Sequence, residues 1–389
     1  MKTNKFLLSI FAATTLFVGC ADDDTAGVTI NQSGGGVMTE EGSNVIGGTL
    51  TEDLTLETGG VYSLQSALIV PEGVTLTMEP GVVVEASTGS DVYIAVLQGG
   101  TINAEGTSSN PIVLTSATAT PNPGDWGGLI LLGRAPINSV VGGDATSTSE
   151  IGGLPYGGSI VNDDSGILRY VRVEFSGGAA DAASENNGFS FYGVGNGTTI
   201  EFIQAFEGAD DGVEFFGGTV DASYISVIGA QDDSVDWTEG YTGNLTNVYI
   251  EHRTSHDKGI EGDGFNTDIG NNSDPIFWSA PSITNLTING LGSSNAESEA
   301  IRLRAGTRAT FNNVIIEGFE EGFDLDDAET GNGVIAGETS ISTISFQDII
   351  VNLKNDTGAD FMESDVISNI VDETTGADYN SWNTGWTRN

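Results

Sequence analysis

Acidic side chains recur at a fixed place in a repeating pattern along the middle of this chain. The pattern is a polar or acidic residue, a small residue, an apolar residue, a polar residue and usually a second apolar residue. Its central apolar positions, spaced 24, 22, 25, 41 and 22 residues apart, are Phe189, Val213, Val235, Ile260, Ile301 and Phe323. The residues that follow them are Ser190, Glu214, Asp236, Glu261, Arg302 and Asp324. A short period with occasional insertions is typical of a solenoid.

Three of these side chains, Glu214, Asp236 and Glu261, are carboxylates in consecutive copies. Alternation with period two predicts a strand for each copy, and neighbouring strands of a parallel sheet lie about 4.8 Å apart. Carboxylates at that separation repel by roughly 1 to 3 kcal/mol per pair at the dielectric of a protein surface. A bound cation, a raised pKa or full hydration must offset this repulsion.

The carboxylates of this pattern offer oxygen ligands, and no cysteine thiolate accompanies them. Such ligands favour a hard cation, and we expect Ca²⁺. The expected ligands are Asp211, Glu214, Asp233, Asp236, Glu261 and Asp263. Corner capping is the alternative for these acids, because Asp oxygens can accept backbone N–H bonds at turns. The sequence leaves the two roles open. A zinc site is not expected, because the only histidines are His252 and His256.

Catalysis on this face would need a base beside the cation. The weak candidates are Lys258, His256 and Arg302. Their spacing follows from the repeat itself, so it is not diagnostic of an enzyme. A binding site for a sugar would need exposed rings, and we expect Tyr249, Tyr241 and Phe206 to point outward and to stack on a glycan.

A second ladder of short apolar strands, each preceding its partner in the first, must position these residues. It comprises residues 171–173, 203–205, 225–227, 248–250, 286–288 and 314–316. Two strands per period, no helix and glycine-rich corners predict an all-β parallel β-helix. The residues just before the ladder predict an aromatic stack followed by an asparagine ladder: Tyr170, Phe202, Tyr224, Asn247, Asn285 and Asn313.

The bulk composition narrows the classes of partner. The chain has 389 residues, 55 glycines and a formal net charge of −43. Such acidity argues against nucleic acid and against an anionic membrane face. It suits cation binding or a solvated, salt-tolerant coat.

The N-terminal residues 1–19 have the pattern of a lipoprotein signal peptide. Lys2 and Lys5 precede an apolar run at residues 6–18, which is too short to span a bilayer. Cys20 is the only cysteine and follows this run directly, so we expect it to carry the lipid that anchors the protein. Residues 20–48 are polar and predict a flexible acidic tether.

Residues 49–389 are expected to form the β-helix with a cap at each end. The first coils begin near Leu50 and include the N-terminal cap. We expect residues 378–389, with Trp382 and Trp386, to fold back over the last coil as the C-terminal cap.

Four blocks of sequence resemble a family of Bacteroidota β-helix surface lipoproteins. They are GDWGGLILLGRAPIN, GVGNGTTIEFIQAFEGADDGVEFFGGTVD, DDSVDWTEGYTGN and the W…GWTR ending. The resemblance implies a right-handed parallel β-helix of the pectate-lyase kind and, with residues 21–24 (ADDD), a place on the outer leaflet of the outer membrane. It does not imply an activity.

The hydrolases that share such a fold carry Asn-Thr-Asp, Asp-Asp, Gly-His-Gly and Arg-Ile-Lys motifs in that order. Here Asn266-Thr267-Asp268 follows Asp232-Asp233, and Gly-His-Gly is absent. We therefore expect a non-catalytic surface protein that binds a glycan or a cation-bridged polymer. The alternatives are a Ca²⁺-dependent uronate lyase or hydrolase, and a structural stalk or subunit of an outer-membrane protein complex.

Overall fold

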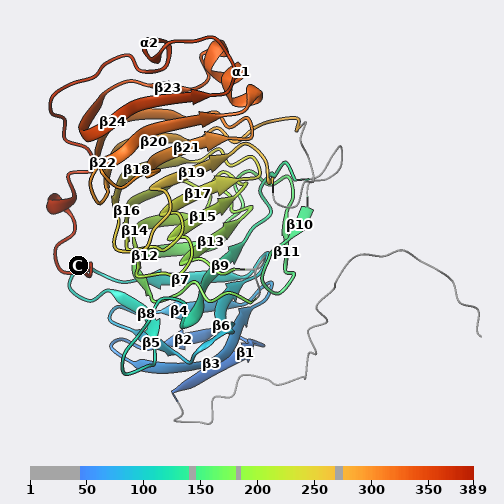
Figure 1. Cartoon of the computed structure of the whole chain (residues 1–389). Helices are drawn as coiled ribbons and strands as arrows, with labels where there is room; N and C mark the ends of the chain where they lie inside the picture. The colour runs from blue at the N-terminus through green and yellow to red at the C-terminus, as the bar shows by residue number, and fades with distance from the viewer. Residues whose placement is uncertain (1–43, 140–145, 181–184, 268–274) are drawn as a thin grey trace, which may run out of the picture. The chain divides into compact units, whose positions relative to one another are not determined.

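The computed structural model describes residues 44–139, 146–180, 185–267 and 275–389. The expected signal peptide, Cys20 and almost all of the tether lie outside these ranges. The described residues form a right-handed parallel β-helix whose 22 strands make one continuous sheet, with a separate two-stranded hairpin (Figure 1). None of the helices in the described ranges is long and apolar enough to span a bilayer.

The first coils are built from short strands that alternate between buried and exposed residues. They are β1 (Val45–Thr49), β2 (Leu54–Leu56), β3 (Val61–Val70), β4 (Thr75–Met78), β5 (Val83–Ala86), β6 (Gly89–Val96), β7 (Thr101–Glu105) and β8 (Ile112–Ser116). β1 pairs only with β3 and β2 only with β4, so these two strands form the N-terminal end of the described solenoid.

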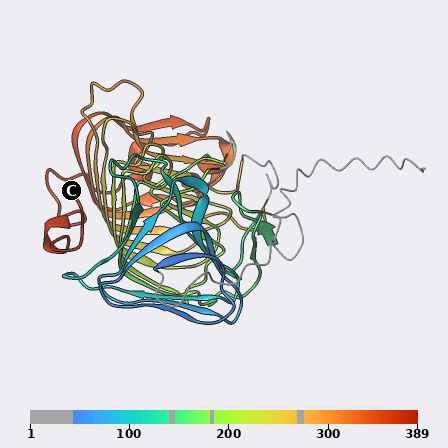
Figure 2. The same cartoon turned by 90° about the horizontal axis from the view of Figure 1, so that it is seen from below.

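Two stacks of parallel strands carry the rest of the β-helix and face away from each other (Figures 1 and 2). The side sheet comprises β12 (Gly166–Glu174), β14 (Thr199–Phe206), β16 (Ala222–Ile228), β18 (Asn244–Glu251), β20 (Ser282–Asn289) and the first part of β22 (Thr310–Asp326). The site sheet comprises β9 (Trp126–Leu132), β13 (Phe189–Tyr192), β15 (Val213–Phe216), β17 (Val235–Thr238), β19 (Ile260–Asp263), β21 (Glu299–Arg304) and the last part of β22. The long strands β22 and β24 (Ile344–Asp356) run through both sheets.

The register of both ladders is the predicted one. In the side sheet Val171 pairs with Ile203, and the pairing continues through Ile225, Val248, Leu286 and Val314. In the site sheet Ser190 pairs with Glu214, followed by Asp236, Glu261, Arg302 and Asp324. The alternate residues of each strand, such as Phe191, Phe215 and Trp237, are buried in the solenoid core. A shift of one residue would move these apolar side chains out of the core, so their burial sets the register of the strands.

The predicted corner ladder is confirmed. Its six residues lie inside the side-sheet strands, where the chain turns a corner, and all have positive φ, between 51° and 61°. The rings of Tyr170 and Phe202 stack with centroids 4.4 Å apart, and those of Phe202 and Tyr224 with centroids 4.1 Å apart. Further along, Asn285 Nδ2 donates to Asn247 Oδ1 at 2.8 Å, and Asn313 Nδ2 donates to Asn285 Oδ1 at 2.6 Å. Asn tolerates this left-handed conformation, whereas the rings depend on stacking to offset its cost.

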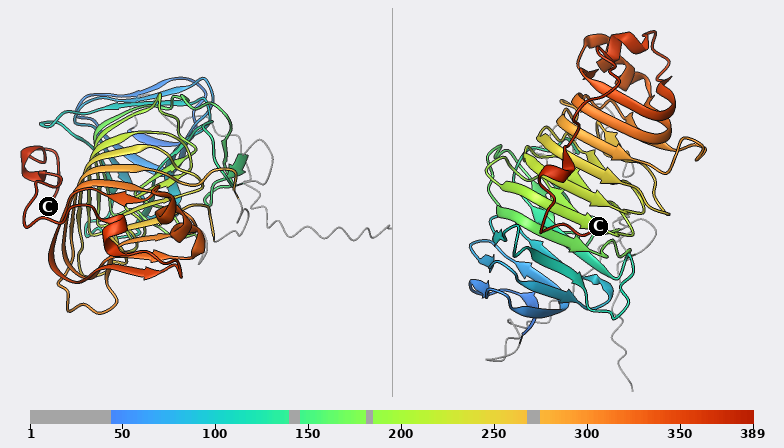
Figure 3. Two further views of the ribbon diagram at one scale, coloured as in Figure 1. Left: turned by 90° about the horizontal axis from the view of Figure 1, so that it is seen from above. Right: turned by 90° about the vertical axis from the view of Figure 1, so that its left-hand side faces the viewer.

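The C-terminal cap prediction is wrong in its location. The last coil, which includes β23 (Ser340–Ile341), is covered by α1 (Ala328–Ala336) and α2 (Glu363–Val366), which the sequence pattern did not predict. Val334 and Val366 bury their side chains in the core there, with Ile367 beside them. The final residues, including the turn η1 (Tyr379–Ser381), instead run along the side sheet (Figure 3, right).

β10 (Thr146–Thr148) and β11 (Pro155–Gly157) form an antiparallel hairpin outside the sheet of the β-helix. Ile151, Leu154 and Tyr156 pack onto an apolar cluster outside the main core, against Tyr192 and Phe216. This packing holds the hairpin beside the outer face of the site sheet.

Candidate functional site

The outer face of the site sheet carries two adjoining columns of charged side chains. The central column runs through Ser190, Glu214, Asp236, Glu261, Arg302, Asp324 and Lys354 in consecutive paired strands. Three residues earlier in each strand segment lie Asn187, Asp211, Asp233, Lys258, Glu299 and Glu321. Contacts between them, such as Asn187 Nδ2 with Glu214 Oε2 at 2.6 Å and Lys258 Nζ with Glu261 Oε1 at 3.2 Å, show that the two columns lie side by side.

A cleft of about 800 Å³ lies over these columns. Eleven of its lining residues are acidic: Glu150, Glu185, Asp210, Asp211, Glu214, Asp232, Asp233, Asp236, Glu239, Asp257 and Glu261. Three are basic: Lys258, Arg302 and Arg304. The β10–β11 hairpin supplies one wall through Ser149, Glu150 and Tyr156. The site sheet therefore provides the floor, and insertions between coils provide the walls.

Two of the acids act as corner caps. Asp211 Oδ1 accepts the backbone N–H of Asp233 at 2.9 Å, and Asp233 Oδ1 accepts the backbone N–H of Lys258 at 2.7 Å. Each cap links one coil to the next. Corner capping is therefore established for Asp211 and Asp233, although the capping bonds leave their Oδ2 atoms available for a cation.

Glu214 and Asp236 make no such cap. Glu214 Oε2 accepts a hydrogen bond from Asn187 Nδ2 at 2.6 Å. Asp236 Oδ1 is buried, and no donor in the described part of the chain reaches it. Burial and then the charge of Asp236 raise the pKa of Glu214 well above its usual range. Burial and then the charge of Glu261 do the same to the pKa of Asp236.

Several sets of three carboxylates bring one oxygen each within 4.8 Å of one another. They include Asp211 with Glu214 and Asp236, Asp233 with Asp236 and Glu261, and Glu185 with Asp210 and Asp232. Such oxygen clusters fit a hard cation such as Ca²⁺ and lack the nitrogen or sulfur ligands of zinc. Burial raises the pKa of Asp210 to about 8, with Glu185 and Asp232 contributing further. These carboxyl groups must therefore share protons or neutralise their charge with a cation.

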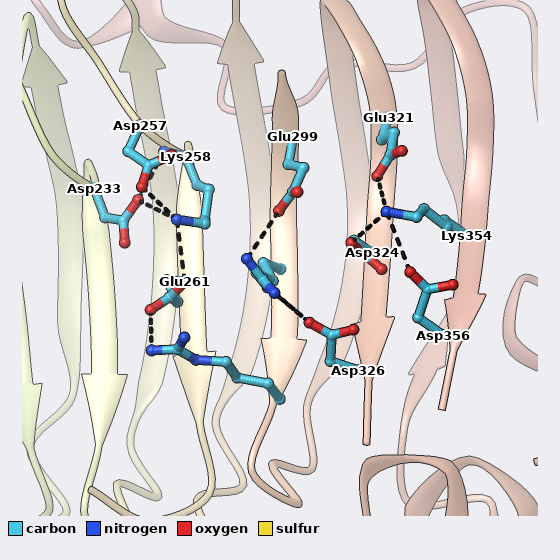
Figure 4. A network of polar contacts seen from close by, with 12 residues as sticks. Asp233, Asp257, Lys258, Glu261, Glu299, Glu321, Asp324, Asp326, Lys354 and Asp356 are labelled. Carbon is cyan, nitrogen blue, oxygen red and sulfur yellow. Dashed lines mark hydrogen bonds and ion pairs between the residues drawn. The ribbon is translucent and has the colours of Figure 1, made fainter. Parts of the chain in front are cut away.

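From Lys258 onward, lysine and arginine side chains within the columns pair with the neighbouring carboxylates (Figure 4). The ammonium of Lys258 lies 2.5 Å from Asp257 Oδ2, 3.2 Å from Glu261 Oε1 and 3.9 Å from Asp233 Oδ1. Arg304 pairs with Glu261 at 2.5 Å and with Asp263 at 2.7 Å. Burial raises the pKa of Asp263 to about 6 against the opposing effect of Arg304.

The same arrangement recurs near the C-terminal end of the columns. Lys354 lies 3.0 Å from Asp324, 3.3 Å from Glu321 and 3.3 Å from Asp356. Arg302 lies 2.5 Å from Asp326. The fold therefore places a built-in ammonium among three carboxylates twice, whereas Asp211, Glu214 and Asp236 have no equivalent ammonium among the described residues.

The three candidate bases are poorly suited to proton abstraction. Burial lowers the pKa of Lys258, but the nearby charges of Asp233 and Glu261 outweigh this effect and raise the pKa. The ammonium of Lys258 therefore stays protonated. Arg302 is held by Asp326 through its Nε and NH2 groups. His256 does not line the cleft; its ring stacks on that of His252 with centroids 4.3 Å apart, and its Nε2 lies 3.3 Å from Asn295.

The prediction of outward sugar-stacking rings is wrong for Tyr241, and the other two predicted rings, Phe206 and Tyr249, are covered by other side chains. Tyr241 is fully buried, its ring stacks on Phe215 in the core, and its hydroxyl donates to Val220 O at 2.8 Å. A turn in which Tyr241 N donates to Thr238 O directs the ring inward instead of outward. Phe206 is 5% exposed on the side sheet, where guanidinium groups cover its ring. Tyr249 stacks on Tyr379 with centroids 3.8 Å apart.

The structure also adds residues that the sequence reasoning missed. Arg304 follows Arg302 by two residues, so strand alternation could have placed it on the same face. Glu150 and Tyr156 enter from an aperiodic loop and gave no such signal. Glu239 is buried and accepts a hydrogen bond from the Tyr156 hydroxyl at 2.7 Å, which ties the hairpin to the site sheet.

A comparison with protein families places the chain beside known β-helix domains. The model of a pectate-lyase-like β-helix domain matches residues 48–387, which is most of the chain. No curated protein matches the sequence.

Proposed function

This chain belongs to the pectate-lyase-like β-helix domain family, and we propose that its acidic cleft binds Ca²⁺ and, through the ion, a segment of an acidic glycan. The observation that carries the proposal is Asp236. Its buried Oδ1 lacks a donor among the described residues, and its strand neighbours are Glu214 and Glu261. A carboxylate in that position requires a proton or a cation.

The repeated ammonium sites support a cation at this position. Lys258 and Lys354 each lie among three carboxylates. Asp211, Glu214 and Asp236 form a similar set in which a diffusible ion would take the place of the ammonium. Ca²⁺ accepts six to eight oxygen ligands in flexible geometry, so water or glycan oxygens can complete its coordination.

An acidic glycan is the ligand class that a Ca²⁺-loaded cleft favours. The unloaded cleft is strongly negative and repels polyanions. A bound divalent ion lowers the negative charge of the cleft at the end that holds Lys258, Arg302 and Arg304, and it offers a positive centre to a glycan carboxylate. Binding therefore depends on Ca²⁺, and glycan carboxylates complete the coordination of the ion.

Binding without turnover is the form of the proposal that the basic groups support. Lys258 is held as an ammonium and Arg302 by Asp326, so neither is a free base for β-elimination. The family match favours a Ca²⁺-dependent lyase as the second candidate function. The two candidates differ in one measurement, the appearance of unsaturated sugar ends after incubation with polygalacturonate.

The proposed place of action is the cell surface, with a lipid on Cys20 as the anchor. The support is the apolar run that ends at Cys20 and the acidic residues that follow it. Metabolic labelling with a radioactive fatty acid should mark the protein and not a Cys20→Ser variant. Protease treatment of whole cells should then remove the β-helix domain.

The test of the binding function is a calorimetric Ca²⁺ titration of the purified protein. We expect a micromolar Kd in the wild type and a loss of at least about 100-fold in a Glu214→Gln/Asp236→Asn double variant, because two charged ligands are removed. The matched control is Glu52→Gln/Asp360→Asn, which removes two exposed charges outside the cleft. No heat from the wild type at millimolar Ca²⁺ would overturn the proposal and favour a structural role.

A further inference from the structure

A strap formed by residues 374–388 lies along the outer face of the side sheet (Figure 3, right). It contacts every strand of this sheet from β22 back to β12. None of the strand pairings in the described ranges includes the strap. It is therefore held as a docked peptide and not as a strand of the sheet.

Aromatic side chains provide the apolar part of this docking. Trp386 is fully buried and meets the ring of Phe202 edge-on, with centroids 6.0 Å apart. The other contacts are Trp382 against Tyr224 at 5.5 Å and Tyr379 stacked on Tyr249 at 3.8 Å. Phe202 and Tyr224 of the corner ladder, together with Tyr249, thus form an aromatic platform on which the rings of the strap pack.

Side chains of the sheet recognise the backbone of the strap. Gln204, which is fully buried, donates through Nε2 to Arg388 O at 2.9 Å and accepts from Arg388 N through Oε1 at 2.7 Å. Arg172 donates to Trp386 O at 2.6 Å, and Thr287 Oγ1 accepts from Ala377 N at 3.0 Å. Backbone recognition by fixed side chains is a feature of peptide-binding grooves.

The side chain of Arg388 makes specific contacts on the side sheet, although 44% of it stays exposed. The guanidinium of Arg388 lies over Phe175 and Phe206, 4.9 and 4.8 Å from the ring centroids. Its NH1 donates to Glu174 Oε2 at 2.6 Å, and Glu174 is only 2% exposed. A buried carboxylate beside two rings favours a planar cation over other side chains, and Glu174 also pairs with Arg172.

We propose that this groove is a peptide-binding site for a Trp-x3-Trp-x-Arg ending, that the strap fills it as an exchangeable ligand, and that the strap of a second copy of this chain can take its place. The occupant follows from complementarity: the rings, the backbone bonds and the contacts of Arg388 all match residues 374–388 of this sequence. The strap of the same chain has a high effective concentration, so exchange between copies requires release of the cis strap or crowding of copies.

The first test uses the full chain with Trp382→Ala/Trp386→Ala, which releases the strap and leaves the groove unchanged. A labelled peptide of residues 373–389 should bind this variant about 100-fold more tightly than the wild type, whose groove is filled. The same peptide with Arg388→Ala should bind at least tenfold more weakly. The matched control is Thr384→Ala, an exposed strap residue, which should leave the groove filled and the peptide unbound. A folded double variant that binds no more peptide than the wild type would overturn the proposal.

Two further measurements do not depend on the tryptophan variant alone. In the wild type, the amide protons of Ala377 and Arg388 should exchange with solvent well before those of buried β14 and β16, and exchange only through global unfolding would refute an exchangeable strap. A Glu174→Lys variant should reject its own Arg388 while keeping an intact strap. Mixed with the released-strap variant, it should form a 1:1 complex in sedimentation, and the absence of that complex would refute exchange between copies.

Discussion

Glu214 and Asp236 occupy paired positions on β15 and β17, yet only one of the two carboxyl groups receives a hydrogen bond from a described residue. Asn187 donates to Glu214, whereas Oδ1 of Asp236 is buried without a donor in the same set of residues. The repeating pattern makes the two positions equivalent, but their surroundings do not. Asp236 is consequently the carboxylate in this cleft that depends most on an added cation.

Replacing Asp236 with Asn should stabilise the metal-free protein and remove its response to Ca²⁺. The charge lies between Glu214 and Glu261, so its removal should raise the free energy of unfolding by roughly 1 to 3 kcal/mol at neutral pH. Thermal unfolding with and without a chelator measures both effects. Asp360→Asn, at an exposed position, should change neither, and an Asp236→Asn protein that is less stable than the wild type without Ca²⁺ would contradict the interpretation.

The stability of the metal-free protein should fall as the pH rises from about 4 to about 8. The pKa of Asp210 is raised from 3.8 to about 8, chiefly by burial, so the folded state holds this proton more tightly than the unfolded chain does. The unfolding free energy is therefore highest below the unfolded pKa and declines through the folded pKa, by at most about 1.4 kcal/mol per pH unit for one proton.

Chemical denaturation at a series of pH values, with a chelator present, measures this slope. Asp210→Asn should flatten it, because the variant has no proton to lose at this position. Saturating Ca²⁺ should also flatten it, since the ion replaces protons among the carboxylates. A wild-type stability that rises between pH 5 and pH 8 without Ca²⁺ would refute the assignment.

Replacing Lys258 with Met should destabilise the protein strongly. The ammonium is the counter-ion of Asp233 and Glu261, both of which are buried. Removing one partner of a buried charge cluster costs about 3 to 5 kcal/mol. Lys354→Met is the matched comparison: its side chain is 37% exposed, although its partner Asp324 is buried, so the loss should be smaller than in Lys258→Met.

Urea unfolding without Ca²⁺ would compare these two lysine variants. Calcium should restore part of the lost stability in the Lys258→Met protein, because the three carboxylates released from the ammonium can then take a cation. Equal losses in the two variants would show that burial does not distinguish the two ammonium groups.

The asparagine ladder should depend on both its hydrogen bonds and its backbone conformation. Asn285 donates to Asn247 and accepts from Asn313, and its φ is 61°. Both Asn285→Gly and Asn285→Ala lose the two hydrogen bonds. Glycine adopts the left-handed conformation at low cost, whereas alanine also pays the cost of that conformation. The Ala variant should be less stable than the Gly variant by about 1 kcal/mol in urea unfolding. Equal stability of the two variants would assign the whole effect to the hydrogen bonds.

The periodicity of the sequence was sufficient to predict the β-helix and its register. Residues such as Glu214 and Asp236 follow core residues at a constant interval, and a shift of one residue would place Phe215 or Trp237 outside the core. The corner ladder was predictable for the same reason, because stacked coils bring equivalent residues into contact. Repetition turns a local pattern into tertiary contacts.

Features outside the repeat were not predictable in this way. The orientation of Tyr241 depends on a turn, and the positions of Phe206 and Tyr249 depend on a strap more than a hundred residues away in sequence. The same limit explains the misplaced C-terminal cap: Trp382 and Trp386 are typical of a segment that covers apolar surface, but the sequence does not state which surface.

The amino-acid sequence by itself therefore determined the coil, the row of carboxylates and the neighbours of each along the axis, because these follow from a constant repeat. Only the tertiary structure decided which carboxylates cap corners, which have ammonium partners and which face the cleft without a donor. Those distinctions arise from insertions and from single side chains such as Asn187, Lys258 and Glu150, whose positions depend on packing across the coils and not on the period of the chain.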